Sequence, residues 1–358
     1  GLTGLTAARH IAKQGYECVL VEREATLGGN LRRISYLEEG GDPQTLLSDL
    51  IADVEQDDKI TVYTGANVKH YGGYLGNYTS EITIDEGETR TVEHGVTIVA
   101  TGGREYRPAE YLYGENDRVM TQLELEKEIE DAKPLVKEAK TVAMIQCVGS
   151  RETDHMYCSR ICCTQAVNNA IKLKEANPET EVYILYRDIR TYGMKELLYR
   201  RARELGVTFI RFDLDSKPEV TEADGKIKLN VYDSVMAANI EIEPDVLALS
   251  AAVRPQLDAE EFASLLKLPL TQDKFFMEAH MKLRPLDFVN EGMYLCGLAH
   301  APKFAGEAIA QAQGAAARAV TILSQPYLMA GGVISVVDKD RCVACLTCVR
   351  SCPFNVPK

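Results

Sequence analysis

Short apolar segments alternate along the chain with segments in which apolar residues recur at helical spacing. Helices are expected where the apolar period is close to 3.6 residues, and strands where a short apolar run ends at a glycine, an acid or a polar turn. The pattern predicts helices over 4–14, roughly 164–176 and 305–324, strands over 17–22, 96–101, 141–146, 181–186 and 292–297, and a hairpin turning at Gly225 within 219–231. Alternating strands and helices are typical of an α/β fold with a parallel sheet.

The first predicted helix and strand have the order of a dinucleotide-binding unit. Gly1 and Gly4 stand where a G-x-G-x-x-G turn has its second and third glycines, Gly15 ends the helix, and Glu22 ends the strand. Gly1 would let the backbone approach a pyrophosphate, and the helix N-terminus would offer it free N–H groups. Glu22 would accept hydrogen bonds from a ribose. Because the preceding strand and first glycine are missing, we expect the chain to be a piece of a longer polypeptide.

Three further segments resemble the flavoproteins that have two dinucleotide-binding domains. They are the turn at 28–30, the strand that ends at 100–102, and the strand that ends at Gly297. The resemblance implies FAD as a cofactor, and it implies FAD contacts at Gly1, Gly4, Glu22, Arg23, Gly28, Gly29, Asn30, Ala100, Thr101, Gly102, Gly297 and Lys303. Leu298 stands where these flavoproteins usually have an aspartate that holds the ribityl chain, so this one contact is in doubt.

Composition and charge restrict the function classes. A length of 358 residues suggests two or three domains, and 46% hydrophobic with 26% charged residues is ordinary for a globular protein. The net charge of −13 argues against a nucleic-acid or anionic-membrane partner. No apolar run approaches the roughly 20 residues of a membrane span, and the first residues have no secretory pattern. We therefore expect a cytoplasmic protein.

Eight of the ten cysteines form two groups. Cys147, Cys158, Cys162 and Cys163 follow the predicted strand 141–146, where a thioredoxin-reductase-like protein would have a glycine-rich phosphate loop. If this segment is helical, the second and third of them lie one turn apart on one face. Bunched thiols in a reducing compartment are better explained as metal ligands than as disulfides. A tetrathiolate suits zinc or a 4Fe–4S cluster, but the spacing matches no common zinc finger.

The second group has the spacing C-x2-C-x2-C-x3-C-P of bacterial ferredoxins. It consists of Cys342, Cys345, Cys348 and Cys352, and it predicts ligands of a 4Fe–4S cluster.

Arg151 and Arg160 lie within the first group, where they either offset cluster charge or are solvated; the sequence does not decide between these roles.

The I-Q-C-V-G-S-R and Y-C-S-R-I-C-C blocks, the flavoprotein segments and the ferredoxin run together resemble the A subunit of heterodisulfide reductase over essentially the whole chain. The resemblance implies that the Cys147 group holds a 4Fe–4S cluster near the flavin. It implies an FAD that splits an electron pair between ferredoxin and a partner subunit, which reduces a disulfide (the heterodisulfide of coenzymes M and B in methanogens). Lys303 or His300, at the start of the last predicted helix, is expected to hydrogen-bond the isoalloxazine edge.

The resemblance also implies the partners. These are disulfide-reducing subunits of the same complex, a hydrogenase or formate dehydrogenase subunit, ferredoxin, and a second copy of the chain. Two other functions remain open, namely an NAD(P)H-dependent iron–sulfur flavoprotein of the glutamate-synthase small-subunit type and a relay that does not bifurcate electrons. The first would need a second glycine-rich phosphate loop, which is not found around 146–151. A zinc-stabilised binding module is a third alternative.

The expected architecture is an α/β fold with an FAD/NAD(P)-binding, Rossmann-like three-layer domain of the thioredoxin-reductase type. This domain is expected to comprise residues 1–110 and 245–325, with a second Rossmann-like domain inserted at 111–244. A ferredoxin-type 4Fe–4S segment is expected at 333–358, after the linker 324–332 with its proline and glycines.

Overall fold

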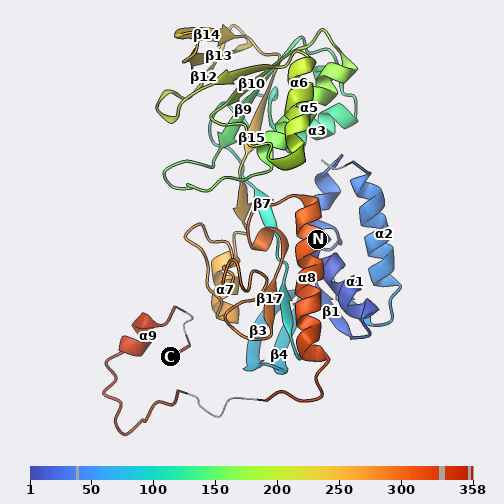
Figure 1. Ribbon diagram of the computed structural model, residues 1–358, viewed down its shortest axis with the longest axis vertical. Helices are drawn as coiled ribbons and strands as arrows, with labels where there is room; N and C mark the ends of the chain where they lie inside the picture. The colour runs from blue at the N-terminus through green and yellow to red at the C-terminus, as the bar shows by residue number, and fades with distance from the viewer. Residues whose placement is uncertain (38–39, 330–334, 354–355, 358) are drawn as a thin grey trace.

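The computed structural model describes residues 1–37, 40–329, 335–353 and 356–357. Two α/β domains lie one above the other in Figure 1, and the chain crosses between them twice. The crossing segments pair as a short antiparallel ribbon of β7 (Gly103–Glu105) and β16 (Val253–Pro255). The α/β class and the Rossmann-like frame expected from the sequence are confirmed.

The first domain begins with the predicted helix and strand. Helix α1 (Leu2–Lys13) ends shortly before the left-handed Gly15, and β1 (Cys18–Val21) follows it. The other strands of this domain are β2 (Ile60–Tyr63), β3 (Asn67–Tyr74), β4 (Asn77–Ile84), β5 (Glu88–His94), β6 (Thr97–Val99) and β17 (Met293–Leu295). The other helices are α2 (Pro43–Glu55), α7 (Ala259–Leu266) and α8 (Ala305–Leu323).

Two parallel strand pairs and one antiparallel sheet form the framework of this domain. β1 pairs with β2, β6 pairs with β17, and β3, β4 and β5 form the antiparallel sheet. α8 packs against α1, as Figure 1 shows. Their contact is close because the buried positions of α8 are alanines, which have little volume. This packing brings the start of α8 close to the glycine turn that begins α1.

The second domain is a five-stranded parallel sheet in the order β11-β10-β9-β15-β8. Its strands are β8 (Val119–Thr121), β9 (Thr141–Val148), β10 (Glu181–Tyr186), β11 (Thr208–Arg211) and β15 (Val246–Ala251). Its helices are α3 (Gln122–Glu130), α4 (Pro134–Lys137), α5 (Cys162–Ala176) and α6 (Glu196–Glu204). An antiparallel meander consists of β12 (Glu219–Ala223), β13 (Lys226–Asp233) and β14 (Ala238–Ile242).

Figure 1 shows the helices on one side of this sheet and the meander on the other. The central strand β9 supplies side chains to both layers because successive strand residues point to opposite faces. Val142 and Met144 pack under the helices, whereas Ala143 and Ile145 pack under the meander. A strand buried on both faces is mostly apolar, which accounts for the continuous apolar run at 142–145.

One expected boundary lies in a different place. The sequence predicts a return of the chain to the first domain at about 245, but β15 pairs with β9 and with β8. The return therefore comes after β15, through β16. The predicted hairpin is present, with Asp224 and Gly225 both left-handed between β12 and β13, as a two-residue turn of this twist requires.

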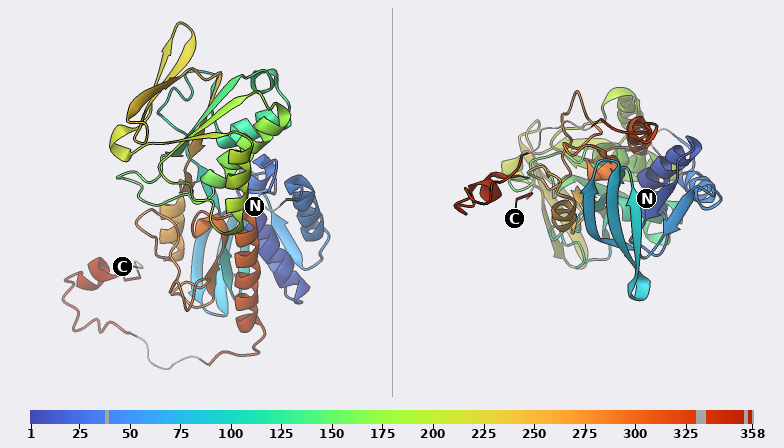
Figure 2. Two further views of the ribbon diagram at one scale, coloured as in Figure 1. Left: turned by 45° about the horizontal axis from the view of Figure 1, so that its top comes forward. Right: turned by 90° about the horizontal axis from the view of Figure 1, so that it is seen from below.

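Helix α9 (Thr347–Ser351) lies apart from both domains, as Figures 1 and 2 show. The expected linker 324–332 and segment 333–358 fall partly outside the described residues, which omit 330–334, 354–355 and 358. Within the described parts of the chain, no helix combines the length and the apolar character needed to cross a bilayer.

Candidate functional site

A cavity of about 1790 Å³ extends from the glycine turn at the start of α1 to residues of α3 and α5 in the second domain. Single-ligand pockets are usually about 300–1,000 Å³, so this one has room for a dinucleotide. Ten of the expected FAD contacts line it: Gly1, Gly4, Glu22, Arg23, Gly29, Asn30, Ala100, Thr101, Gly102 and Lys303. The other two, Gly28 and Gly297, do not line it, although Leu298 does.

Glycines line part of this cavity. The turn at Gly28 and Gly29 has left-handed backbone, and a Cβ on Gly29 would lie only 3.1 Å from the Cα of Gly1. Glu22 lies beside them, with its Oε2 3.1 Å from the nitrogen of Gly1 and its Oε1 accepting the N–H of Glu24. Close-approaching backbone next to the carboxylate of Glu22 fits the pyrophosphate and ribose of a dinucleotide.

Gly297 has a packing role at the same end of α1, where it lies against Thr3. Its φ is +72°, and a Cβ there would come within 2.6 Å of the side chain of Thr3. Its N–H donates to Oε1 of Gln311, and its carbonyl accepts from Nζ of Lys303. Gly297 therefore allows the turn before α8 to pack directly on α1.

Lys303 lines the cavity and is only 7% exposed. Its Nζ donates to the carbonyls of Gly297 and Ala301, each at 2.7 Å. Burial, with a smaller contribution from the nearby Arg160, lowers the pKa of Lys303 to about 8. The amine therefore gains or loses its proton near pH 8, where a change in a neighbouring charge can alter its protonation.

His300, the alternative candidate, is turned away from the cavity. Its Nε2 lies 2.9 Å from Oε2 of Glu278, and its Nδ1 lies 2.9 Å from Nε2 of Gln311. Because Oε1 of Gln311 already accepts the N–H of Gly297, its Nε2 must donate to Nδ1. The imidazole therefore has its proton on Nε2, which donates to Glu278. Burial lowers the pKa of His300, in keeping with a neutral ring.

The first cysteine group lies at the carboxyl end of β9, in a segment that we call the thiol loop, residues 147–163. Cys147 lies at the end of β9, Cys162 and Cys163 are the first residues of α5, and all three are buried. Cys158 lies in non-helical backbone before α5, so the helical alternative for the 158–162 segment is wrong. The physical reason is the left-handed Arg160, which interrupts helical backbone between the two cysteines.

The four thiols are electrostatic neighbours. The neighbouring thiol of Cys163, burial, and the thiols of Cys147 and Cys158 raise the pKa of Cys162 well above the usual range. The neighbouring Cys162 thiol lowers the pKa of Cys163 to about 7. The described residues contain no group of three His, Cys, Asp or Glu side chains arranged to hold a single metal ion.

N–H donors already point at these sulfurs. Nη1 of Arg151 lies 3.8 Å from Sγ of Cys147, and the N–H of Arg160 donates to Sγ of Cys158 at 3.3 Å. Hydrogen bonds to sulfur are one of the means by which proteins tune iron–sulfur clusters. Four thiols, three of them buried, with N–H donors beside them suit a 4Fe–4S cluster by the chemistry of the donor set.

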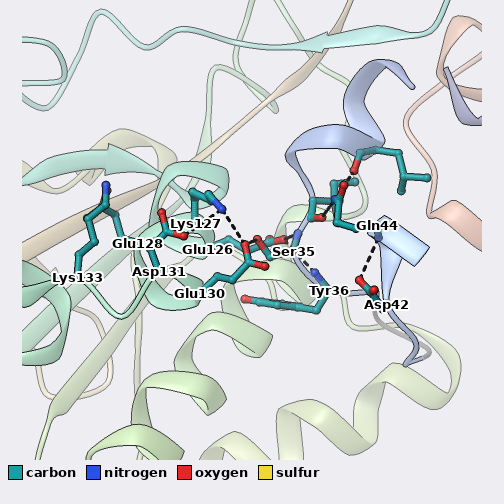
Figure 3. A network of polar contacts seen from close by, with 12 residues as sticks. Ser35, Tyr36, Asp42, Gln44, Glu126, Lys127, Glu128, Glu130, Asp131 and Lys133 are labelled. Carbon is teal, nitrogen blue, oxygen red and sulfur yellow. Dashed lines mark hydrogen bonds and ion pairs between the residues drawn. The ribbon is translucent and has the colours of Figure 1, made fainter. Parts of the chain in front are cut away.

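A buried carboxylate between the domains was missed by the sequence analysis. Glu126 of α3 is 2% exposed and lines the cavity. It accepts the N–H groups of Ser35 and Tyr36 from the first domain and the amide of Gln165 from α5, and Figure 3 shows its contacts with Ser35 and Tyr36. Burial raises its pKa. The surrounding segment, Glu124 to Glu130, has the pattern of a solvated charged helix, so no sequence signal singled it out.

The second cysteine group lies near α9. Cys342, Cys345 and Cys348 are exposed, and Cys352 is partly exposed. Ala344 and Leu346 have left-handed backbone, which bends the segment at residues between the cysteines. The donors and their spacing suit a ferredoxin-type 4Fe–4S cluster.

Comparisons with known proteins bear on the fold and on two segments of the chain. Residues 1–60 match the family described as NAD(P)-binding Rossmann-like domain, and residues 335–358 match the 4Fe-4S binding domain. Among solved structures, the thioredoxin reductases of Lactococcus lactis and T. acidophilum are similar in fold, with TM-scores of 0.62 and 0.61. They share 18% and 14% identity and cover 90% and 91% of this chain, which covers 96% of each of them.

Two curated relatives are similar over nearly the full chain. The iron–sulfur A subunit of the CoB–CoM heterodisulfide reductase of Methanocaldococcus jannaschii is 30% identical over 99% of this chain and 68% of its own length. The A subunit of the H(2):CoB–CoM heterodisulfide,ferredoxin reductase of Methanothermobacter marburgensis has the same identity and coverage. The cofactors expected from the sequence, FAD and 4Fe–4S clusters, are supported by these matches. The chain therefore belongs to the family of heterodisulfide reductase A subunits, the iron–sulfur flavoprotein components of oxidoreductases that act on sulfur groups.

Proposed function

We propose that the chain transfers electrons between an FAD in its first domain and two separate 4Fe–4S clusters, one in the thiol loop and one near α9. The observation that carries this proposal is the contact between the thiol loop and the turn before α8. Arg160 of the loop donates to the carbonyl of Pro302, next to Lys303, which lines the cavity. The two candidate redox sites are therefore neighbours.

When bound, FAD exchanges electrons in pairs, whereas a 4Fe–4S cluster takes one electron at a time. The residues of this chain would bind and orient these groups. The glycine turn would accept the pyrophosphate, Glu22 the ribose, and Gly102 and Asn30 the region near the ring. Lys303, buried and able to change its charge, would hold or release a proton at Nζ as the charge beside it changes.

In a complex, this arrangement would connect a donor of electron pairs with acceptors of single electrons. The donor would be a hydrogenase or formate dehydrogenase subunit. The acceptors would be ferredoxin and a disulfide-reducing subunit, and two copies of the chain would occur in one complex. Names of relatives include hydrogen or formate together with ferredoxin, which supports these partner classes. Bifurcation of the electron pair belongs to this proposal.

The test is quantification of FAD, iron and acid-labile sulfide, with EPR spectra, on anaerobically purified chain and on Cys162→Ala and Cys345→Ala variants. Each variant should lose the iron and the EPR signal of one cluster and keep those of the other, with FAD unchanged. Colourless protein, zinc in place of iron, or loss of all iron in either variant would contradict the proposal.

Two further measurements separate the alternatives. An NAD(P)H-dependent flavoprotein would bind NADPH at the carboxyl end of β9, so bleaching of the flavin by NADPH would favour that function. A bifurcating flavin has a second one-electron reduction potential above its first. The flavin of a simple relay has its first potential above its second. Spectroelectrochemical titration of the flavin distinguishes them.

A further inference from the structure

The thiol loop is attached to the rest of the protein on both sides of Cys158. Oη of Tyr157 donates to the carbonyl of Val253 at 2.8 Å, and its ring meets the edge of Phe275 at 5.4 Å between centroids. Oγ of Ser159 accepts the N–H of Val253 at 3.0 Å. Val253 belongs to the ribbon that joins the domains, and Phe275 is buried in the first domain. The residues on either side of Cys158 are therefore held against the ribbon and the first domain.

Arg160 makes the most extensive of these attachments. Nη1 donates to the carbonyl of Pro302 at 3.1 Å, and Nη2 donates to Oε1 of Glu307 and to Oη of Tyr192, each at 2.7 Å. The guanidinium also lies over the ring of Tyr192, 5.2 Å from its centroid. Its own N–H donates to Sγ of Cys158. One residue therefore contacts a cluster ligand through its backbone and the start of α8 through its side chain.

The backbone of Arg160 supports a specific role. Its φ of +60° is uncommon for a residue with a side chain. Such conformations persist when the surroundings compensate their cost, and they gather at functional sites. Here the left-handed turn directs the N–H to the sulfur of Cys158 while the side chain reaches the other domain.

We infer that Arg160 is a positioning residue that locks the thiol loop onto the 302–307 turn of the first domain and thereby fixes the separation between the cluster site and the FAD site. This inference rests on the proposed function for its redox consequence, but its structural part does not. Domains in one chain move relative to each other unless an interface restrains them. Electron transfer slows steeply as two sites separate, so a restraint at this point would keep transfer fast and reproducible.

A lysine should not replace Arg160. The planar guanidinium of Arg160 donates to the Pro302 carbonyl from one nitrogen and to Glu307 and Tyr192 from the other. The ammonium group of a lysine is a single point of charge and does not have this geometry. The ion pair alone would contribute little because Arg160 and Glu307 are both more than one-third exposed. The geometry of the fork, rather than the charge, is therefore what positions the loop.

The experiment measures hydrogen exchange by mass spectrometry on the anaerobic chain with its FAD and iron. In Arg160→Lys and Arg160→Gln, backbone amides of 297–307 and 157–163 should exchange about tenfold faster than in the unchanged chain. The matched control is Arg200→Gln, which breaks an exposed pair within α6 and should leave these segments unchanged. Flavin-to-iron electron equilibration after flash reduction should slow by a similar factor in the two Arg160 variants.

Tyr192→Phe provides a second route if the Arg160 variants lose iron. It removes one hydroxyl acceptor without altering the thiol loop, and it should speed exchange of 297–307 about threefold with iron retained. Unchanged exchange in this variant and in both Arg160 variants would overturn the inference, and so would full protection in Arg160→Lys. If the chain contains no iron at all, the proposed function fails, but exchange in the iron-free chain still tests the lock.

Discussion

Replacing Lys303 with Met should make the stability of the protein less dependent on pH. The pKa of the buried amine is about 8, whereas a lysine in the unfolded chain titrates near 10.5. The neighbouring titratable groups that act on it are Arg160, which lowers its pKa, and Glu307, Cys296 and Glu278, which raise it. Burial outweighs them all, so the folded protein binds this proton less tightly than the unfolded chain.

The sign and size follow from proton linkage. Between pH 8 and 10.5 the unfolded chain holds the lysine proton and the folded protein does not, so stability rises with pH in this window. The pKa difference corresponds to a cost of about 3 kcal/mol at neutral pH, and about 2 kcal/mol of it disappears between about pH 7 and about pH 9.5. The Met variant has no such cost, but it loses hydrogen bonds to two carbonyls, worth about 1 kcal/mol each at any pH.

The assay is urea unfolding of the cofactor-free chain at several pH values, followed by near-UV circular dichroism. The free energy of unfolding of the unchanged chain, minus that of Lys303→Met, should increase by about 2 kcal/mol from about pH 7 to about pH 9.5. Lys13→Met, at the exposed end of α1, is the control and should show no such change. A pH-independent difference for Lys303→Met would refute the reasoning, because it would mean that the buried amine keeps an ordinary pKa.

Two other substitutions test the FAD cradle. Gly297→Ala should destabilise the chain by about 2–3 kcal/mol and lower its FAD content, because it combines a left-handed backbone with a clash; Gly225→Ala, with the same backbone and open space, should cost only about 1 kcal/mol in the same unfolding assay. Glu22→Gln should weaken FAD binding about tenfold by equilibrium dialysis and leave iron content unchanged; equal loss of both cofactors would contradict a ribose role.

Local patterns were enough to predict much of the fold. The helix over 4–14, the strands at 17–22 and 181–186, and the turn at Gly225 are set by apolar period and by residues that tolerate left-handed backbone, and both are visible in a single sequence. The cavity-lining residues near the glycine turn were also predictable, because the motif lies within one strand–helix unit.

The remaining features depend on partners distant in sequence. Arg160 was left between a solvated role and a charge-balancing one, and it could not be resolved because its acceptors lie about 145 residues away in Pro302 and Glu307. The boundary at 245 was placed too early because an apolar strand such as β15 suits either sheet, and only pairing assigns it. His300 seemed equivalent to Lys303 until Glu278 and Gln311 were seen to occupy its nitrogens.

The position of the thiol loop has a simple electrostatic rationale. In an open parallel sheet, ligands bind at the carboxyl ends of the strands, where neighbouring connections diverge. β9 lies between β10 and β15, and the loop after it leads into the N-terminus of α5. That position favours negative charge, because the first N–H groups of the helix are free and its dipole is positive there. Cys163, whose pKa is lowered to about 7, lies in the first turn of α5, where a thiolate is favoured for the same reason that phosphate is in a nucleotide-binding domain. A cluster held by four thiolates is itself an anion, so the fold would exchange one anionic ligand for another and keep the same electrostatic site.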